Sequence, residues 1–297
     1  MSLDVLVVGG AGVDTTVYVP VLPLPYADTY AVPPIVDRIG NTGAGVVLGC
    51  HALGLAAKLV DIIGDDPQGR LVRETMEARG VPFAYEVSAA GTRRSVLLVD
   101  DEGRRLSLYD PRFTPGERLS AASYRDDLAA ARHVHLSITD FSRHLYPEVR
   151  EAGVPCSTDL HDWDGRADYQ KDFAYGSDLV FLSAAALDDM GETMRAILRG
   201  GRAEAVICTA GARGAYLLTD PDGEPRHTPP APLPGPVADS NGAGDAFVSG
   251  FLYGRLRGRD VEECMRLGAI AGAHACATTG THEAPIDERT LLRRAGR

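Results

Sequence analysis

Lysine is nearly absent from this chain of 297 residues, which contains only Lys58 and Lys171. Neither lysine follows a glycine-rich loop, whereas a P-loop nucleotide-binding protein requires the motif G-K-[ST]. A protein kinase requires a strand lysine that pairs with the phosphates of ATP. The sequence therefore argues against both classes. Any phosphate bound by this chain must be held by backbone N–H groups, a metal ion or arginine.

The chain also lacks features of secreted, membrane-spanning and nucleic-acid-binding proteins. The N-terminus has no basic region typical of a signal peptide, and no apolar run approaches the length of a membrane span. The five cysteines form no C-x-x-C pair, as expected for reduced, buried thiols. The net charge of -11 disfavours binding to nucleic acid or to an acidic membrane. We therefore expect a cytoplasmic globular protein whose ligands are small molecules.

Short apolar runs alternate with helical patterns along most of the chain. The runs typical of buried strands lie at 5–8, 57–62, 133–138, 155–160, 179–182, 205–209 and 215–219. The helical patterns lie at 46–55, 67–79, 119–131, 169–175, 185–199 and 261–277. Strands that alternate with helices predict a doubly wound α/β fold with a mostly parallel sheet. We expect a single domain over residues 1–297.

Two segments interrupt this alternation. Residues 15–37 are proline-rich and irregular, and residues 91–113 contain two short strand patterns joined by a turn at 100–103. We expect these excursions to form a small β sheet that stands off the main domain. Such a sheet could act as a lid that excludes water from a reaction, and a plain surface hairpin is the alternative.

The most informative motif is DSNGAGDAF at residues 239–247, which leads into a helical pattern. A helix that begins at Gly242, Ala243 and Gly244 offers unpaired N–H groups and the positive end of its dipole to an anion. Asp245 lies in the first turn of this helix and could take a proton from an attacking hydroxyl. The combination suits phosphoryl transfer. The alternative is that Asp245 only caps the helix.

Three other segments at predicted strand ends contain polar or glycine residues. Asp14 follows the first strand, at the edge where α/β sheets bind ligands, and could accept hydrogen bonds from substrate hydroxyls. A turn-forming role is the alternative for this residue. Further glycine loops lie at 40–45 and 209–214, and the latter could frame a nucleotide. The residues of interest in these loops are Gly40, Asn41, Thr209, Gly211 and Gly214.

Taken together, these motifs resemble those of the PfkB (ribokinase-like) family of carbohydrate kinases. Residues 239–247 are similar to the family's C-terminal signature D-T-x-G-A-G-D-x-F, and residues 40–54 with 64–69 are similar to its N-terminal signature. Residues 209–214 supply a third match. The matches occur in the family's order and span nearly the whole chain. Weaker similarities to ketohexokinase lie at 108–110, 175–183 and 266–280.

The resemblance implies transfer of the γ-phosphoryl group from ATP, with Mg²⁺, to a hydroxyl of a sugar or sugar-like alcohol. It implies that Asp245 is the catalytic base and that residues 242–244 form the anion hole. The substrate-contacting positions that it implies are Asp14, Gly40, Asn41 and Arg104. The nucleotide-contacting positions that it implies are Thr209, Gly211, Gly214 and Asn241.

The chain departs from the family pattern at three places. Gly45 stands where the family often has an asparagine that contacts a sugar hydroxyl. Residues 183–186 replace the metal motif N-x-x-E, so Mg²⁺ must rely on water, phosphate or a carboxylate such as Asp188. Asn241 replaces a threonine, which bears on a monovalent-cation site near Asp239.

Several functions and roles stay open at this point. A kinase for a free sugar, with a ketose or pentose preferred, is the leading hypothesis. A nucleoside kinase and a non-catalytic sugar or nucleotide sensor are the alternatives, and a homodimer through the lid is plausible. His133 and His135 share a strand face and could form a metal pair. The acidic loop 159–164 could line the active site or be a solvated loop.

Overall fold

The computed structural model describes residues 3–278 and 280–296, so the first two residues and residue 279 of the ketohexokinase-like segment lie outside the described residues. A nine-stranded sheet has the order β13-β12-β11-β10-β9-β8-β1-β4-β5. Neighbouring strands from β11 to β5 pair in parallel, whereas β12 and β13 pair antiparallel. The strands are β1 (Val5–Val8), β4 (Ala57–Gly64), β5 (Phe83–Ser88), β8 (Val134–Leu136), β9 (Cys156–Asp159), β10 (Leu179–Ser183), β11 (Ala205–Thr209), β12 (Ala215–Leu218) and β13 (Arg226–Thr228).

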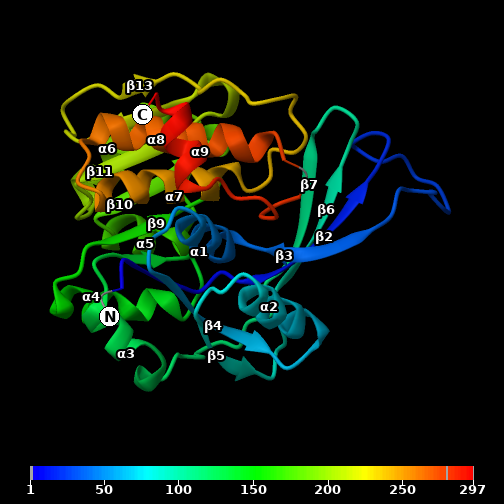
Figure 1. Cartoon of the computed structure of the whole chain (residues 1–297), viewed down its shortest axis with the longest axis horizontal. Helices are drawn as coiled ribbons and strands as arrows, with labels where there is room; N and C mark the ends of the chain where they lie inside the picture. The colour runs from blue at the N-terminus through cyan, green and yellow to red at the C-terminus, as the bar shows by residue number, and fades with distance from the viewer. Residues whose placement is uncertain (1–2, 279, 297) are drawn as a thin grey trace.

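Helices cover both faces of this sheet (Figure 1). Side chains alternate between faces along a strand, and β1 divides accordingly. Val5 and Val7 pack in one hydrophobic cluster with α1, α2, α7, α8 and α9. Leu6 and Val8 pack in a second cluster with α3, α4, α5 and α6. The helices are α1 (Thr42–Ala52), α2 (Pro67–Ala78), α3 (Ala121–Ala130), α4 (Tyr146–Ala152), α5 (Lys171–Gly176), α6 (Met190–Gly200), α7 (Ala243–Leu256), α8 (Val261–Cys276) and α9 (Glu288–Arg294).

The predicted doubly wound, mostly parallel α/β fold is confirmed, with differences at element borders. The helix predicted over 185–199 begins only at Met190, because Asp189 caps it by accepting a hydrogen bond from Glu192 N at 2.9 Å. The preceding residues Ala184–Ala186 form a short 3-10 turn. Among the described helices, none is both long and apolar enough to cross a membrane.

A second sheet of four strands stands off the main sheet, as predicted (Figure 1). Its order is β3-β2-β6-β7, and β2 pairs in parallel with β6 while β2–β3 and β6–β7 pair antiparallel. The strands are β2 (Gly12–Tyr18), β3 (Val36–Gly40), β6 (Arg94–Val99) and β7 (Arg105–Asp110). Strand pairing begins before residue 15 and continues past residue 37. The small sheet therefore starts directly after β1 and returns directly before α1.

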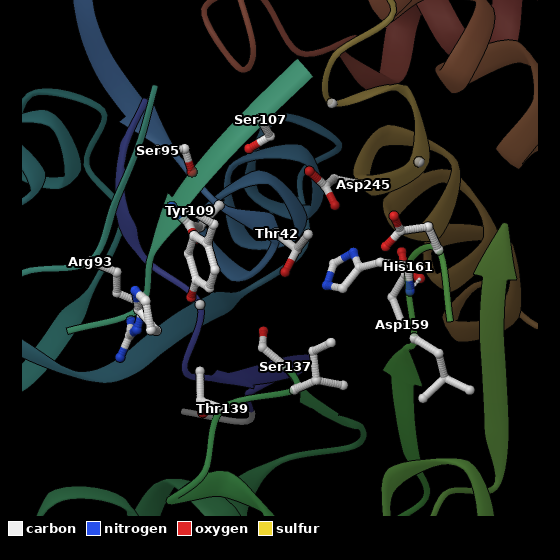
Figure 2. A pocket seen from close by; sticks show the side chains of 18 of the residues that line it. Thr42, Arg93, Ser95, Ser107, Tyr109, Ser137, Thr139, Asp159, His161 and Asp245 are labelled. Atoms are coloured by element: carbon white, nitrogen blue, oxygen red, sulfur yellow. Dashed lines mark hydrogen bonds between the residues drawn. The ribbon is translucent and has the colours of Figure 1, made fainter. Parts of the chain in front are cut away.

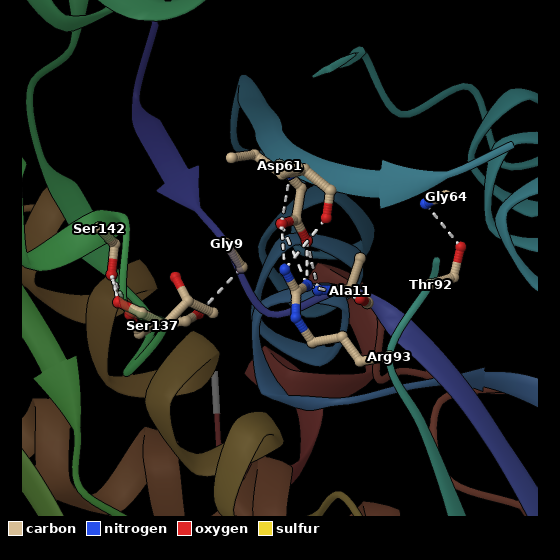
Figure 3. A network of polar contacts seen from close by, with 10 residues as sticks. Gly9, Ala11, Asp61, Gly64, Thr92, Arg93, Ser137 and Ser142 are labelled. Carbon is tan, nitrogen blue, oxygen red and sulfur yellow. Dashed lines mark hydrogen bonds and ion pairs between the residues drawn. The ribbon is translucent and has the colours of Figure 1, made fainter. Parts of the chain in front are cut away.

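A buried ion pair fixes the base of the small sheet to the main sheet (Figure 3). Arg93, just before β6, donates from Nη1 and Nη2 to the carboxylate of Asp61 in β4 at 2.9 Å. The same guanidinium donates to the carbonyl oxygens of Ala11 and Ile62. Asp61 in turn accepts from Ala11 N at 2.6 Å. These bonds hold the entry to β2 and the entry to β6 against one carboxylate.

Candidate active site

A cavity of about 940 Å³ is lined by residues of both sheets and of the first turn of α7. The small sheet contributes Ser95 from β6 and Ser107 and Tyr109 from β7, which face the cavity in Figure 2. The main sheet contributes residues just beyond the carboxyl ends of β8, β9 and β10. This is the edge of an open α/β sheet at which ligands bind.

The first turn of α7 forms one wall of the cavity. Gly242 is the N-cap with a φ of 76°, and a methyl group at this position would lie 2.2 Å from Thr281 O. Gly242, Gly244 and Asp245 line the cavity, and Ala243 is the first helical residue between them. The free N–H groups of a helix start face an anion favourably. The predicted anion hole therefore opens into the cavity.

Asp245 carries a deeply buried carboxyl group, with a side chain that is 9% exposed. Burial raises its pKa well above the ordinary value, and the nearby carboxylates of Asp159 and Asp14 raise it further. Arg105 acts in the opposite direction. A carboxyl with a raised pKa holds a proton well once it has taken one. This is a useful property for a group that must remove a hydroxyl proton.

Asp14, Gly40 and Asn41 lie together beside this carboxyl. Asp14 lines the cavity, and burial raises its pKa, although hydrogen bonds from Ser95 and Thr281 oppose that effect. A methyl group at Gly40 would lie 2.2 Å from Asp14 Cγ, so glycine makes the room for this carboxyl. Asn41 has a φ of 69°, and its Nδ2 is a buried donor with no partner among the described residues. These groups can bind substrate hydroxyls.

The structure does not bring the predicted Arg104 to the cavity. Its guanidinium bonds to Asp100 at 2.7 Å near the tip of the hairpin, and it is not among the described residues that line the cavity. Arg105 lines the cavity instead, and its Nη1 donates to Asn241 Oδ1. Neighbouring strand residues point to opposite faces. Arg104, directly before β7, therefore does not share the inward position of Arg105, and its predicted contact with substrate stays a prediction.

Asn241 connects three parts of the site. Its Oδ1 accepts a hydrogen bond from Arg105 of β7. Its Nδ2 donates to Thr281 Oγ1 at 2.7 Å, and its backbone N donates to Asp239 Oδ1 at 2.8 Å. It lines the cavity next to the anion hole. Its predicted role as a nucleotide contact stays a prediction, since its side chain is engaged with protein groups.

The third glycine loop reaches the cavity only at one end. Thr209, the last residue of β11, lines the cavity. Gly211 and Gly214 belong to the turn between β11 and β12, and neither is among the described residues that line the cavity. Their predicted contacts with a nucleotide stay a prediction. A nucleotide that lay over this turn would extend outward from the cavity rather than fill it.

The loop after β9 lines the cavity, which the sequence left undecided. Asp159, His161 and Asp162 all contribute to the wall, and Figure 2 shows the His161 ring pointing inward. His161 has a φ of 56°, a conformation that few residues other than glycine and asparagine adopt. Its N–H donates to Asp159 Oδ1 at 2.9 Å, which holds this turn.

The metal motif N-x-x-E is missing from this chain, but the structure brings the carboxylate of Asp159 near the anion hole. Asp159 Oδ2 lies 3.9 Å from the position that a methyl group on Gly244 would take. Asp188, proposed above, instead pairs with Arg166, and its side chain is 80% exposed. Asp188 is also absent from the described cavity wall. Asp159 is therefore a carboxylate of the cavity wall near the anion hole, and its oxygens are of the kind that Mg²⁺ prefers as ligands.

His133, directly before β8, and His135, within β8, have a structural explanation. His133 Nε2 and His135 Nδ1 both bond to Ser157 Oγ, at 2.8 and 2.9 Å. Burial lowers the pKa of His133 to about 3 and that of His135 to about 4, so both rings are neutral. The described residues contain no group of three potential metal ligands. The pair belongs to the polar interior of the sheet.

His282 is the site residue that the sequence did not indicate. It is buried, lines the cavity, and places Nε2 3.5 Å from Asp245 Oδ2. It lies in an irregular segment after α8, 37 positions from Asp245 in the sequence. A single histidine in such a segment carries no motif. Only the fold brings it to the carboxyl.

Comparisons with known proteins support the same assignment. The profile described as "pfkB family carbohydrate kinase" matches residues 173–289. The acarbose 7(IV)-phosphotransferase of an Actinoplanes species is 50% identical over 293 residues, which cover 98% of each chain. The structure of the microbiome-derived acarbose kinase Mak1 has a TM-score of 0.94 and 48% identity, with 100% of each chain covered.

A more distant structure agrees on the fold. Ribokinase of Arabidopsis thaliana, solved with ribose and ATP, has a TM-score of 0.81 and 21% identity over 99% of each chain. This similarity bears on the fold alone, whereas the 50% identity above bears on the family. The chain therefore belongs to the PfkB family of carbohydrate kinases, and it is an ATP-dependent phosphotransferase that acts on a hydroxyl of a sugar or sugar-like compound.

Proposed function

We propose that this kinase phosphorylates a hydroxyl of an acarbose-like pseudo-oligosaccharide rather than a free ketose or pentose. The observation that carries this proposal is the extent of the cavity, whose wall includes Tyr169 and Gln170 as well as Asp14 and Asp245. A single sugar ring needs only the part beside Asp245. The relatives at 50% and 48% identity bear the name of acarbose, a chain of hydroxylated rings, and this supports the same substrate class.

The far arm of the cavity has the composition of a sugar-binding surface. Phe113 and Tyr169 supply aromatic faces, and Thr139 and Asp140 supply polar groups. Tyr169 is held by a hydrogen bond from its Oη to Ile138 O at 2.9 Å. Thr139 Oγ1 is buried and has no partner among the described residues, so it is available to a ligand hydroxyl. Remote binding of this kind positions the reacting ring.

The reaction at the near end follows from the groups described above. Asp245 removes the proton of the acceptor hydroxyl as its oxygen attacks the γ-phosphorus. The bond from that phosphorus to the bridging oxygen breaks, and ADP leaves. The N–H groups of residues 242–244 face the charge on the transferred group. Asp14 and Asn41 orient the acceptor, and Arg105 ties the small sheet across the site. This sheet then excludes water as a lid.

The residues present fit ATP and Mg²⁺. The helix start of α7 suits phosphate, and Asp159 supplies the carboxylate that the missing metal motif would have supplied. When bound, Mg²⁺ neutralises phosphate charge. The dependence of the rate on K⁺ tests the monovalent-cation site expected near Asp239.

The test measures ADP release from Mg-ATP with acarbose, maltotriose, ribose, fructose and a nucleoside as acceptors. We expect turnover with acarbose and a kcat/KM at least about tenfold higher than with either free monosaccharide. Preference for ribose, fructose or the nucleoside would overturn the proposal in favour of the smaller acceptor. ATP binding without turnover on any acceptor would favour the sensor.

A matched pair of variants tests the far arm. Tyr169→Ala should raise KM for acarbose about fivefold, since one aromatic contact of this kind contributes about 1 kcal/mol, and should leave any turnover of a monosaccharide unchanged. Tyr85→Ala removes an equally exposed tyrosine of β5 that does not belong to the described cavity wall. It should change neither constant.

A further inference from the structure

The imidazole of His282 is a buried group with an unused nitrogen. Its side chain is 5% exposed, and Nε2 has no hydrogen-bond partner among the residues that the structure describes. The same nitrogen lies 3.5 Å from Asp245 Oδ2. A buried polar atom without a partner is costly. A small change at Asp245 would supply the partner, because the two atoms already face each other.

Gly45 makes this arrangement possible. A methyl group at position 45 would lie 2.4 Å from His282 Cε1 and 2.6 Å from Asp245 Oδ2. Any larger side chain there would displace the ring or the carboxyl. The family's usual asparagine at this position would therefore compete with His282 for the same space. In this chain, a histidine from the segment after α8 occupies the side of Asp245 from which the asparagine is missing.

The second ring nitrogen shows which tautomer is present. His282 hydrogen-bonds to the backbone of Asn41, and this bond favours a proton on the ring. A backbone group that favours the proton is a carbonyl, and Nε2 has no partner among the described residues, so we assign the donated proton to Nδ1 and the lone pair to Nε2. Burial lowers the pKa of His282 to about 4, so the ring is neutral at physiological pH. A neutral ring of this form can only accept at Nε2.

We propose that His282 Nε2 accepts a hydrogen bond from protonated Asp245 and thereby stabilises the state of the base that forms during phosphoryl transfer. The proposal rests on the function of Asp245 given above. As the acceptor O–H bond breaks, the proton forms an O–H bond at Oδ2, and this group donates to Nε2. The electron pair of the acceptor oxygen forms the new bond to phosphorus. His282 is thus a positioning residue, because it accepts a hydrogen bond from Asp245 once Asp245 has taken the proton.

The other charged groups around this pair come from separate elements. Asp14 of β2 and Asp159 at the end of β9 are carboxylates near Asp245, and Arg105 of β7 is the nearby cation. Around the ring of His282, the neighbours are Gly45 of α1, Gly242 before α7 and the Asn41 backbone, all of them uncharged. Among the neighbours named here, Asp245 is therefore the group in contact with the ring whose charge changes when it takes a proton.

The first test compares His282→Leu with His282→Gln. Leucine removes the acceptor, so we expect kcat with Mg-ATP and acarbose to fall about 10- to 100-fold while KM for ATP stays within twofold. Loss of a hydrogen bond to the protonated carboxyl destabilises that form, so the acid limb of the rate should move to lower pH. Glutamine retains an acceptor and should restore most of both properties.

His274→Leu is the matched control. His274 is a partly buried histidine of α8 that is not among the described residues of the cavity wall. Its replacement should leave kcat and the acid limb unchanged. A His282→Leu enzyme with wild-type kcat, or with an acid limb unchanged or moved to higher pH, would overturn the inference. Wild-type turnover in the same assay would show that the proposed function survives that result.

A second measurement does not need turnover. Nitrogen-15 NMR of histidine-labelled protein, without nucleotide, reports the tautomer of His282 directly. We expect a neutral ring with its proton on Nδ1 from pH 7 to pH 5, and a shift of the Nε2 resonance when Asp245 is changed to asparagine. A proton on Nε2, or an Nε2 resonance that ignores the Asp245→Asn change, contradicts the proposed contact even if no acceptor sugar is found.

Discussion

Two buried aspartates, Asp61 and Asp245, differ in the hydrogen-bond donors and charged groups that surround their carboxyl groups. Asp61 is fully buried and is surrounded by donors, since Ala11 N, Ile62 N and both terminal nitrogens of Arg93 bond to its oxygens at 2.6–2.9 Å. Asp245 is nearly as buried, yet its Oδ2 lies 3.5 Å from Nε2 of the neutral His282 ring, and its electrostatic neighbours include two carboxylates. Asp61 is therefore held by several donors, whereas the raised pKa of Asp245 shows an environment that disfavours its ionised form.

We interpret the difference as one between a structural carboxylate, Asp61, and the proposed catalytic base, Asp245. A buried charge that has its full set of donors fixes the chain around it, and removing one partner leaves the other uncompensated. A buried carboxyl that lacks donors has a raised pKa and a high affinity for a proton. In this protein the structural group anchors the small sheet, and the reactive group faces the cavity beneath it. The predictions below test whether this division holds.

The largest effect is expected at the reactive group. Asp245→Asn keeps the size of the side chain and removes the base, so kcat should fall by roughly 10²–10⁴ while the Kd for ATP stays nearly constant. The unfolding free energy should stay the same or rise, since a poorly satisfied buried carboxyl is replaced by a neutral group. Steady-state kinetics and calorimetric ATP binding measure the two quantities. Near wild-type turnover would remove Asp245 from the mechanism.

The pH dependence of the unfolding free energy, measured for the wild type and for Asp245→Asn, makes this prediction more specific. Because the pKa of Asp245 is raised in the folded state, the folded protein binds this proton more tightly than the unfolded chain does. The stabilisation is present at low pH and is lost as the pH rises through the folded-state pKa. The stability of Asp245→Asn relative to the wild type should therefore increase with pH. The acid limb of kcat/KM should lie above the ordinary carboxyl range near pH 4.

A loss of stability is expected at the structural group. Asp61→Asn leaves the Arg93 guanidinium buried without its counter-charge, which typically costs about 3–5 kcal/mol of unfolding free energy. Urea unfolding followed by circular dichroism measures this change, with Asp245→Asn as the matched replacement of a second buried aspartate. If both variants lost the same free energy, burial alone would set the cost and the contrast between the two sites would be wrong.

The sequence predicted those features that depend on contiguous residues. The alternation of apolar runs and helical patterns specified the parallel sheet, since buried strands are apolar on both faces. The strand β5 was missed because it lies at the sheet edge, where only part of its surface is buried. The start of α7 was predicted because its glycines and Asp245 are neighbours in the chain. Motifs of this kind carry both the conformation and the chemistry.

Features that depend on distant segments were not predicted. His282 reaches Asp245 only because the segment after α8 folds back beside Gly45. Asp159 reaches Gly244 from the end of β9, and nothing in the local sequence of either residue indicates the other. Arg104 lies away from the cavity for a different reason. A strand changes face at every residue, so the sequence of the hairpin alone does not indicate which of Arg104 and Arg105 points into the cavity.

The pair Arg104 and Arg105 therefore provides the finest test of how the small sheet contributes. Arg105→Ala removes the bond to Asn241 and the cation near Asp14 and Asp245. We expect KM for the acceptor to rise about tenfold, as for loss of one charge-assisted hydrogen bond. The acid limb should also move to higher pH, because a cation that lowers both carboxyl pKa values is gone. Arg104→Ala removes the half-exposed guanidinium that pairs with Asp100 and Glu102 outside the described cavity wall, and it should change KM by less than about twofold. Kinetics of both variants across pH with the same acceptor decide between them. If Arg104→Ala had the larger effect, the outer face of the small sheet would take part in acceptor binding, and the inward position of Arg105 would be incidental.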